Sequence, residues 1–233
     1  MHSVSELGKL LIISPHLDDA VFSCGEALAC KGNATVATLF AGLPPASLPL
    51  TKWDAAAGFN GSREAMELRR EEDRRAMELL QATPVWLDFL DSQYNDPPTE
   101  IALAETIAQL IETHNPYTVV LPAGLFHSDH VITHQAGLLA RRHYPERRWY
   151  LYEDNLYRRI PRLLQERLAG LAHFGIDATP VAFDTHGQAG LKRHAVQCYA
   201  SQLQALVTPG RPGHSDIYAP EGFWELSSDN PAI

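Results

Sequence analysis

Short apolar runs alternate with longer amphipathic segments along most of this 233-residue chain, and this alternation narrows the fold more than any other feature. The run from Lys9 to Ser14 is almost continuously apolar, which is typical of a strand buried on both faces of a sheet. The segment from Asp19 to Lys31 follows with helical periodicity and ends before Gly32. Because neighbouring parallel strands need crossover connections, this order of strand, turn and helix favours a parallel sheet.

The same periodicities predict the remaining elements. Strands are predicted at residues 34–41, 84–90, 117–121, 148–152 and 179–183. Helices are predicted at residues 62–80, 101–113, 128–142 and 186–206. On the first of these helices, the candidates for the buried side are Ala65, Met66, Leu68, Ala76, Met77, Leu79 and Leu80. We therefore expect one α/β domain over residues 1–233, with a Rossmann-like, mostly parallel sheet and helices on both of its faces.

A long segment at about residues 42–61 lacks a clear periodicity and contains three prolines and several glycines. Unstructured segments of this length are uncommon in compact domains and usually form lids or binding loops. We expect a lid-like loop here. Trp53 and Asp54 within it are candidates for substrate contact. The alternative for Trp53 is that its ring only plugs the loop.

The charge balance argues against several classes of partner. The formal net charge is -9, and the basic residues are mixed with acidic ones, so no basic surface that could bind the phosphates of nucleic acid is expected. The first residues, MHSVSELGKLLIISPH, lack the pattern of a secretory signal, and no transmembrane segment is predicted, so we expect a cytoplasmic protein. Cys24, Cys30 and Cys198 show no C-x-x-C spacing and are expected to be reduced thiols. A homo-oligomer is compatible with these features.

Two clusters of histidine and aspartate stand directly after predicted strands. Residues 15–19 read PHLDD, and residues 127–130 read HSDH. In open α/β sheets, ligands bind beyond the carboxyl ends of the strands, so the two clusters face one crevice if their strands are neighbours. The first strand is not followed by G-x-G-x-x-G, which argues against a nicotinamide or flavin enzyme.

An imidazole and two carboxylates within four residues can bind a divalent metal and leave one carboxylate free. Three protein ligands and a water are typical of catalytic zinc, whose bound water is acidified and deprotonated by a nearby carboxylate. A second imidazole would stabilise an oxyanion, which completes the requirements of an amide hydrolase. The competing interpretation is that Asp18 or Asp19 only caps a helix. Spacing alone leaves His127, His130 and His134 as alternative ligands.

The PHLDD and HSDH segments resemble the two signature motifs of the N-acetylglucosaminyl-phosphatidylinositol de-N-acetylase family, also called the PIG-L or LmbE-like deacetylases. The resemblance extends over most of the chain: Arg69 and Glu72 match an R-x-x-E on the family's second helix, Asp91 matches an aspartate after a strand, and SQL at Ser201 matches a C-terminal segment. Leu125 stands where some members of the family have a tyrosine.

The resemblance implies a role for each matching residue. It implies zinc ligands at His16, Asp19 and His130, a general base at Asp18, an oxyanion-stabilising group at His127, and substrate contacts at Arg69 and Asp91. It further implies a zinc-dependent hydrolase, with Fe²⁺ as an alternative ion, that removes an N-acetyl group from an amino sugar or glycoconjugate. The alternatives are a metal-dependent amidase with a non-sugar or thiol-conjugate substrate and a non-catalytic binding module.

Several acidic and imidazole groups near these motifs keep two interpretations each. Asp129 either orients His127 or caps the helix that follows. His134 is either a group behind the ligands or a residue on the helix surface. Glu153 and Asp154 follow a predicted strand and are further candidates for lining the crevice.

Overall fold

The computed structural model describes residues 2–94, 97–185, 187–209 and 214–228. Its main sheet has seven strands in the order β4-β3-β2-β5-β6-β9-β7. In chain order these strands are β2 (Leu10–Ser14), β3 (Thr35–Thr38), β4 (Thr83–Trp86), β5 (Thr118–Pro122), β6 (Arg148–Tyr152), β7 (Ile176–Val181) and β9 (Phe223–Ser228). A separate pair is formed by β1 (His2–Ser3) and β8 (Phe183–Asp184).

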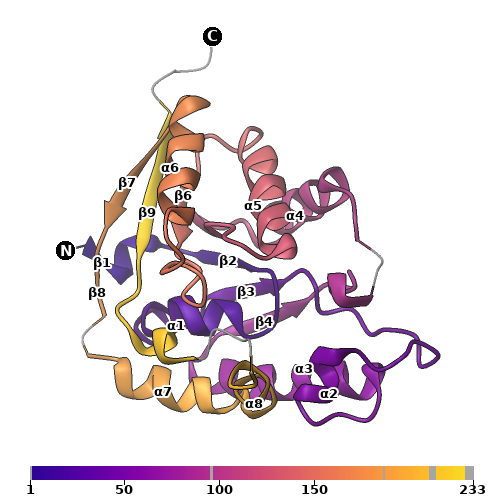
Figure 1. Cartoon of the computed structure of the whole chain (residues 1–233). Helices are drawn as coiled ribbons and strands as arrows, with labels where there is room; N and C mark the ends of the chain where they lie inside the picture. Colours follow the sequence, from indigo (N-terminus) through magenta and orange to yellow (C-terminus); the bar gives the residue numbers. More distant parts are fainter. Residues whose placement is uncertain (1, 95–96, 186, 210–213, 229–233) are drawn as a thin grey trace.

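Helices cover both faces of this sheet, as predicted (Figure 1). They are α1 (Asp19–Lys31), α2 (Lys52–Ala56), α3 (Ser62–Leu79), α4 (Glu100–His114), α5 (Ser128–Arg141), α6 (Leu163–His173), α7 (Ala189–Gln197) and α8 (Ala200–Leu206). Short 3-10 helices η1 (Val4–Leu7), η2 (Ser92–Tyr94) and η3 (Ser215–Tyr218) complete the described elements. The predicted fold class, a single α/β domain with a mostly parallel sheet, is confirmed.

The central strand β2 explains why both faces are covered. Its residues are all buried, and alternate side chains of a strand point to opposite faces. Leu10 and Ile12 join the hydrophobic cluster on the side of α1, α3 and α7, whereas Leu11 and Ile13 join the cluster on the side of α4 and α5. The first long apolar run of the sequence therefore forms the strand that packs against both hydrophobic clusters.

The strand β2 also lies at the point where the strand order reverses. It pairs in parallel with β3 on one side and with β5 on the other, with Leu11 opposite both Thr35 and Val119. The chain proceeds outward through β3 and β4 and then returns across the sheet to β5. The predicted strands before the two histidine motifs are thus neighbours, and their carboxyl ends open on the same edge.

The C-terminal third departs from the predicted alternation. Helix α6 and strand β9 were not predicted, and β9 runs antiparallel to both β6 and β7. The strand predicted at residues 179–183 begins earlier and ends at Val181. Pro180 is tolerated there because β7 is the edge strand of the sheet, where a missing N–H breaks no ladder on the open side.

The helix predicted at residues 186–206 is wrong as a single element. The chain forms α7 and α8 with a break at Cys198 and Tyr199, and position 186 lies outside the described residues. A new helix begins at Ala200 because the Glu72 carboxylate accepts hydrogen bonds from the backbone N–H and the hydroxyl of Ser201, at 2.9 and 2.6 Å.

The segment at residues 42–61 is not entirely irregular, because it contains the short helix α2. Thr51 caps this helix by accepting a hydrogen bond from the backbone N–H of Asp54 at 3.0 Å. The Asp54 side chain is buried and accepts a hydrogen bond from the Tyr94 hydroxyl at 2.9 Å. The strands predicted at residues 34–41 and 84–90 end early, at Thr38 and Trp86. Beyond these ends an isolated bridge joins Phe40 to Asp88, and the backbone N–H of Gly42 donates to the carbonyl of Phe89 at 2.9 Å.

The predicted buried side of α3 needs one correction. Ala65, Met66, Ala76, Met77 and Leu80 are buried, whereas Leu68 and Leu79 are 46% and 43% exposed. Two charged residues, Arg69 and Asp73, are buried on the helix instead. Arg69 lines the pocket described below, so this face of α3 serves a polar site as well as the core.

Within the described ranges, no helix is both long and apolar enough to cross a membrane. The three cysteines are free, as expected, with Cys24 buried and the other two half-buried.

Candidate active site

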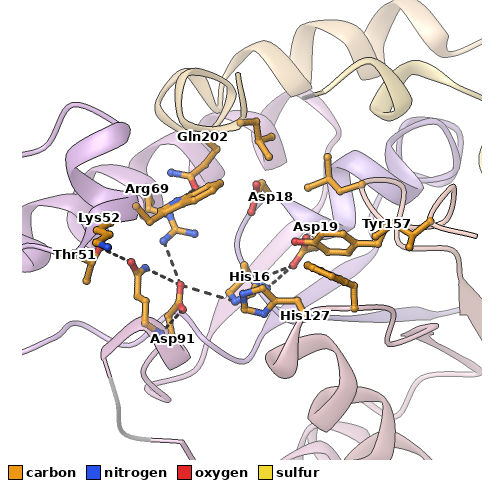
Figure 2. A pocket seen from close by; sticks show the side chains of 16 residues that line it. His16, Asp18, Asp19, Thr51, Lys52, Arg69, Asp91, His127, Tyr157 and Gln202 are labelled. Atoms are coloured by element: carbon orange, nitrogen blue, oxygen red, sulfur yellow. Dashed lines mark hydrogen bonds and ion pairs between the residues drawn. The ribbon is translucent and has the colours of Figure 1, made fainter. Parts of the chain in front are cut away.

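A cavity of about 690 Å³ opens beyond the carboxyl ends of the central strands (Figure 2). It is lined by His16, Asp18, Asp19, Thr51, Lys52, Trp53, Arg69, Asp91, Gln93, Phe126, His127, Leu156, Tyr157, Ile160, Gln202 and Leu206. Six of the seven residues that the motifs single out therefore line one cavity, and the seventh, His130, lies directly behind it.

The centre of the site is the carboxylate of Asp19, at the start of α1. Its Oδ2 lies 3.1 Å from Nδ1 of His16 and 3.1 Å from Nε2 of His130, which belongs to α5. Ligand atoms about 2.1 Å from a tetrahedral ion lie roughly 3.4 Å from one another. Two of the three pairs of donor atoms are therefore close to the spacing that a tetrahedral metal would impose.

Each of the two histidines has a carboxylate behind its other nitrogen. Nε2 of His16 lies 3.0 Å from Oδ2 of Asp129, and Nδ1 of His130 lies 2.6 Å from Oδ1 of Asp154. Histidines that bind metals usually donate their second N–H to such a group, which fixes the ring and increases its basicity. The paired arrangement favours His16, Asp19 and His130 as one donor set.

Two other donor sets share His16. Ring nitrogens of His16, His127 and His130 lie within 4.8 Å of one another, and so do donor atoms of His16, Asp91 and Asp129. The first set lacks a carboxylate, and the second would require Asp91 to leave its ion pair with Arg69, whose Nη1 lies 3.7 Å away. The set built on Asp19 requires neither change.

The carboxylates around Asp19 favour positive charge on the two imidazoles. Burial would lower the pKa of His130, but the Asp19 and Asp154 carboxylates outweigh it and raise this pKa to about 9. Burial would also lower the pKa of His16. The carboxylates of Asp91, Asp129 and Asp19 outweigh this effect, so the pKa of His16 lies well above its usual value. Protonated imidazoles thus balance the buried carboxylates, and a metal ion that displaced those protons would supply the same positive charge.

Asp18 is the free carboxylate of the first motif. It is buried, yet it makes no capping hydrogen bond to α1, so the interpretation of Asp18 as a simple helix cap is wrong. Burial and then the charge of Asp19 raise its pKa to about 6, against the opposing effects of Arg69 and His16. Its position beside His16 and Asp19 in the cavity suits a group that accepts a proton (Figure 2).

His127 precedes α5 and acts as its N-cap. Its Nδ1 accepts a hydrogen bond from the backbone N–H of Asp129 at 3.3 Å. Burial, together with the neighbouring rings of His16 and His130, lowers the pKa of His127 to about 4. A neutral ring that accepts at Nδ1 carries its proton on Nε2, so His127 can donate a hydrogen bond into the cavity.

Arg69 and Asp91 lie together on another side of the cavity. The Arg69 side chain is almost fully buried, and its Nε and Nη1 have no hydrogen-bond partner. Asp91 is held by the backbone N–H and side-chain amide of Gln93, at 3.1 and 2.9 Å. A buried guanidinium with unsatisfied donors at a cavity wall suits a ligand with oxygen acceptors, such as a polyhydroxylated ring.

The groups whose interpretation was open have distinct positions. Asp129 contacts His16 and accepts a hydrogen bond from the backbone of Ser92, at 3.1 Å, rather than only orienting His127 or capping α5. His134 is buried, not on the surface, and its Nδ1 lies 2.9 Å from the Pro122 carbonyl oxygen. Burial and the charge of Arg167 lower its pKa to about 3.

Gln202, Phe126 and Tyr157 emerged only from the structure, and Asp154 was a sequence candidate whose pairing with His130 emerged only there. Asp154 was a weak candidate because acids at strand ends are common, and nothing in the sequence pairs it with His130. Gln202 joins the cavity from α8 and accepts a hydrogen bond from Nε1 of Trp53 at 2.9 Å. Phe126 and Tyr157 line the opposite wall, and no motif singles them out.

Comparisons with known proteins identify relatives of this chain. The family model described as GlcNAc-PI de-N-acetylase, PIG-L, matches residues 11–141, which is more than half of the chain. The 2'-N-acetylparomamine deacetylase of Streptomyces fradiae is 32% identical over 146 residues, which cover 55% of this chain and 50% of that protein. The match thus spans about half the length of this curated relative.

Two solved structures resemble nearly the whole chain. The A40926 pseudoaglycone deacetylase Dbv21 is 27% identical, with a TM-score of 0.75, and the match covers 97% of this chain and 100% of that one. The zinc-inhibited form of the teicoplanin deacetylase Orf2 is 26% identical, also with a TM-score of 0.75, over 96% of this chain and 100% of that one.

Proposed function

Because this chain belongs to the PIG-L family of metal-dependent de-N-acetylases, we propose that it hydrolyses the N-acyl amide of an amino sugar or a glycoconjugate. The observation that carries the proposal is the pair of histidines directed at one oxygen of Asp19, each with a carboxylate behind it. The names of the relatives, a 2'-N-acetylparomamine deacetylase, an A40926 pseudoaglycone deacetylase and a teicoplanin deacetylase, support a sugar-linked substrate.

The proposed reaction adds water across the amide. The oxygen of water bonds to the carbonyl carbon, the bond from carbon to nitrogen breaks, and the products are a carboxylic acid and a free amine. Asp18 accepts the proton from the attacking water and passes it to the leaving nitrogen. His127 donates the hydrogen bond from Nε2 to the oxygen on which negative charge develops.

His16, Asp19 and His130 would hold the metal. When bound, a divalent ion supplies Lewis acidity and makes water a stronger acid. Nitrogen and carboxylate ligands suit zinc, which we propose as the ion, and they accept Fe²⁺ as well. Arg69 and Asp91 would bind hydroxyl groups of the sugar and so place its amide between Asp18 and His127.

The activity test compares wild type with Asp18→Asn on a panel of N-acetylated amino sugars, with release of free amine as the readout. Each protein is loaded with one equivalent of Zn²⁺ or Fe²⁺, because the zinc form of the relative Orf2 is described as inhibited. Removing a general base costs about 10²–10⁴-fold in kcat, and we expect a loss in this range with metal content unchanged. An unaltered kcat in Asp18→Asn would refute the assignment of the base.

A second test separates the three donor sets by metal content. Asp19→Asn, His127→Ala and Asp91→Asn each remove a member that belongs to one set only. We expect Asp19→Asn to lose most of its metal, and the other two variants to keep it after dialysis against weak chelator. If Asp19→Asn retains its metal while His127→Ala or Asp91→Asn loses it, the metal is held by the set to which that other residue belongs.

A further inference from the structure

The loop that leads into the second histidine motif has an unusual conformation. We call residues 123–126, between β5 and α5, the β5–α5 loop. Phe126 has a φ of 63°, and the backbone N–H of His127 donates to the carbonyl of Leu125 across it at 2.7 Å. Positive-φ γ-turns of this kind are rare and strained, and they persist only where the surrounding structure fixes them. The side chain of Phe126 is 66% exposed, so its own burial does little to fix the turn.

The peptide group that joins Gly124 to Leu125, which we call the clamped peptide, is bound at both of its polar atoms. Its carbonyl, on Gly124, accepts a hydrogen bond from Nη2 of Arg167 at 2.7 Å. Its N–H, on Leu125, donates to Oδ2 of Asp154 at 2.9 Å. Because a peptide group is planar, bonds to both of these atoms fix its orientation. Both partners are charged, and such hydrogen bonds are roughly twice as strong as neutral ones.

Gly124 explains why this peptide depends on its partners. Its φ is 73°, and a Cβ there would lie 2.5 Å from Cβ of His134 on α5. Glycine is therefore needed for the β5–α5 loop to lie so close to the helix. Glycine also adopts many backbone conformations at similar cost, so its own stereochemistry does not fix the clamped peptide. The orientation of this peptide is set by Arg167 and Asp154 instead.

Within the described residues, the side chain of Arg167 makes one hydrogen bond, and that bond is to the clamped peptide. Its Nε is buried and has no hydrogen-bond partner there. Burial lowers the pKa of Arg167, and the charge of Asp154 opposes this effect. A buried donor without a partner costs free energy, so the position of Arg167 serves the clamped peptide rather than its own donors.

The clamped peptide is connected with both histidines of the second motif. Oδ1 of Asp154 lies 2.6 Å from Nδ1 of His130, while Oδ2 of the same carboxylate holds the clamped peptide. The γ-turn at Phe126 separates this peptide from His127, which lines the cavity. A rotation of the clamped peptide would therefore move the backbone that carries the His127 ring. Arg167 itself does not line the cavity.

We infer that Arg167 is a positioning residue, which fixes the clamped peptide and so places the His127 imidazole beside the reacting amide. This inference rests on the proposed amide hydrolysis, in which His127 donates a hydrogen bond to the developing oxyanion. Arg167 adds no chemical step of its own. It belongs to α6, a helix that the sequence did not predict, so the C-terminal third of the chain supports a motif of the central sheet.

The first test measures kcat and KM for amine release by metal-loaded Arg167→Met, which loses the hydrogen-bond donor. Because a small displacement of a catalytic group costs up to about 100-fold, we expect kcat to fall about 10- to 100-fold and KM to change less than about threefold. Arg167→Lys keeps a donor and should recover part of the loss. A kcat that is unchanged in Arg167→Met would overturn the inference.

Arg147→Met is the matched control. Nη1 of Arg147 holds the carbonyl of Pro116 at 2.9 Å, so this arginine also binds a backbone carbonyl beside β5, but before the strand begins rather than after it ends. Its replacement should leave kcat unchanged. Equal losses of kcat in Arg147→Met and Arg167→Met would show a general effect on the fold, and the inference would fail.

A double variant shows whether the effect passes through His127. His127→Ala alone removes the oxyanion donor and lowers kcat. If Arg167 acts through that ring, adding Arg167→Met to His127→Ala should lower the remaining kcat by less than about threefold, because the two losses are then not additive. A second loss as large as that of Arg167→Met alone would show that Arg167 acts elsewhere.

A spectroscopic test does not depend on activity. The His127 ring lies 5.0 Å from the ring of His16 and 5.6 Å from that of His130, so a displacement changes the ring-current shift of its Cε1–H signal. In the zinc-loaded chain, Arg167→Met should move this NMR signal and should speed hydrogen exchange of the Leu125 amide at least about tenfold. Arg147→Met should do neither.

The two readouts separate failure of the inference from failure of the proposed function. If wild type releases amine and Arg167→Met leaves the His127 signal in place, the proposed function stands and the inference is overturned. If wild type releases amine from no substrate, the proposed function fails, and the NMR result decides the placement of His127 by Arg167. A displaced signal with faster Leu125 exchange supports it, and an unchanged spectrum overturns it.

Discussion

Asp73 on α3 is a carboxyl group buried outside the cavity. Its two oxygens accept hydrogen bonds from Nε1 of Trp86 and the hydroxyl of Tyr199, each at 2.7 Å. Burial nevertheless raises its pKa to about 7, because these two bonds do not replace the hydration that the charge loses. In the unfolded chain the same group titrates near pH 4.

The raised pKa of Asp73 sets the sign of a pH dependence. Between about pH 4 and pH 7 the folded state holds a proton that the unfolded state has released, so the free energy of unfolding falls as the pH rises through this window. The loss is on the order of 4 kcal/mol. Asp73→Asn imitates the protonated acid and should show a much smaller loss between pH 5 and pH 8, measured by urea unfolding in the presence of chelator. Parallel curves for the two proteins would contradict the assignment.

Individual residues of the site could be predicted from the sequence where they stand close together in it. His16, Asp18 and Asp19 could be grouped because they stand within four residues, after a strand. The carboxylate behind His130 could not, because Asp154 lies 24 positions away and only the parallel pairing of β5 with β6 brings it close. The contact between the rings of Phe126 and Tyr157 was missed for the same reason, since no spacing links these two residues.

Helix α8 shows how one element depends on another for its start. The Glu72 carboxylate of α3 holds Ser201, the side-chain amide of Gln202 donates to the Ser201 hydroxyl at 2.9 Å, and Gln202 in turn accepts from Trp53. These bonds connect α3, α8 and α2 along one side of the cavity. Glu72 therefore acts as a positioning residue, and it does not line the cavity.

Glu72→Gln should lower the free energy of unfolding by about 1–2 kcal/mol, because the amide can accept only one of the two hydrogen bonds strongly. Since Gln202 and Trp53 lose their support, KM should rise severalfold while kcat changes less. Glu71→Gln is the control, because among the described residues the Glu71 side chain bonds only to Arg74 and Arg75, on the surface. This variant should leave both quantities unchanged. If the two variants behave alike, Glu72 does not position α8.

Element types were easier to predict than their limits. The bounds of α1 and β6 agree with the prediction, because the residues on either side of each element interrupt its periodic pattern of apolar residues. The break between α7 and α8 could not be read from the sequence, since the helical pattern continues through it and the cause is a tertiary contact from Glu72. Strand β9 was missed because it joins the sheet only through pairing with β6 and β7.

One buried ion pair connects the C-terminal segment with the rest of the molecule. Nζ of Lys192 on α7 lies 2.9 Å from Oε1 of Glu221, and both side chains are almost fully buried. Glu221 also accepts hydrogen bonds from the backbone N–H groups of Glu26 and Ala27 in α1, at 2.7 and 3.1 Å. Gly25 makes room for this contact, because a Cβ there would lie 2.7 Å from Cγ of Lys192.

Lys192→Met should destabilise the whole domain by about 3–5 kcal/mol, because it leaves a buried carboxylate without its partner. Adding Glu221→Gln removes that charge, so the double variant should be more stable than the sum of the two single losses predicts, by about 0.5–3 kcal/mol. Urea unfolding of the four proteins in a double-mutant cycle measures this coupling. Strictly additive losses would show that the pair does not act as a unit.

The reversal of strand order between β2 and β5 has a consequence for biosynthesis. His16 and Asp129, which touch, are 113 positions apart, and Asp154 follows still later in the chain. The ribosome must therefore release both central strands before the three proposed ligands exist, and β6 before the carboxylate behind His130 does. In a zinc finger the ligands are close in sequence and the ion drives folding. Here the proposed ligands come together only where β2 pairs with β5, so an ion bound between them would depend on the central sheet as much as on the donors themselves.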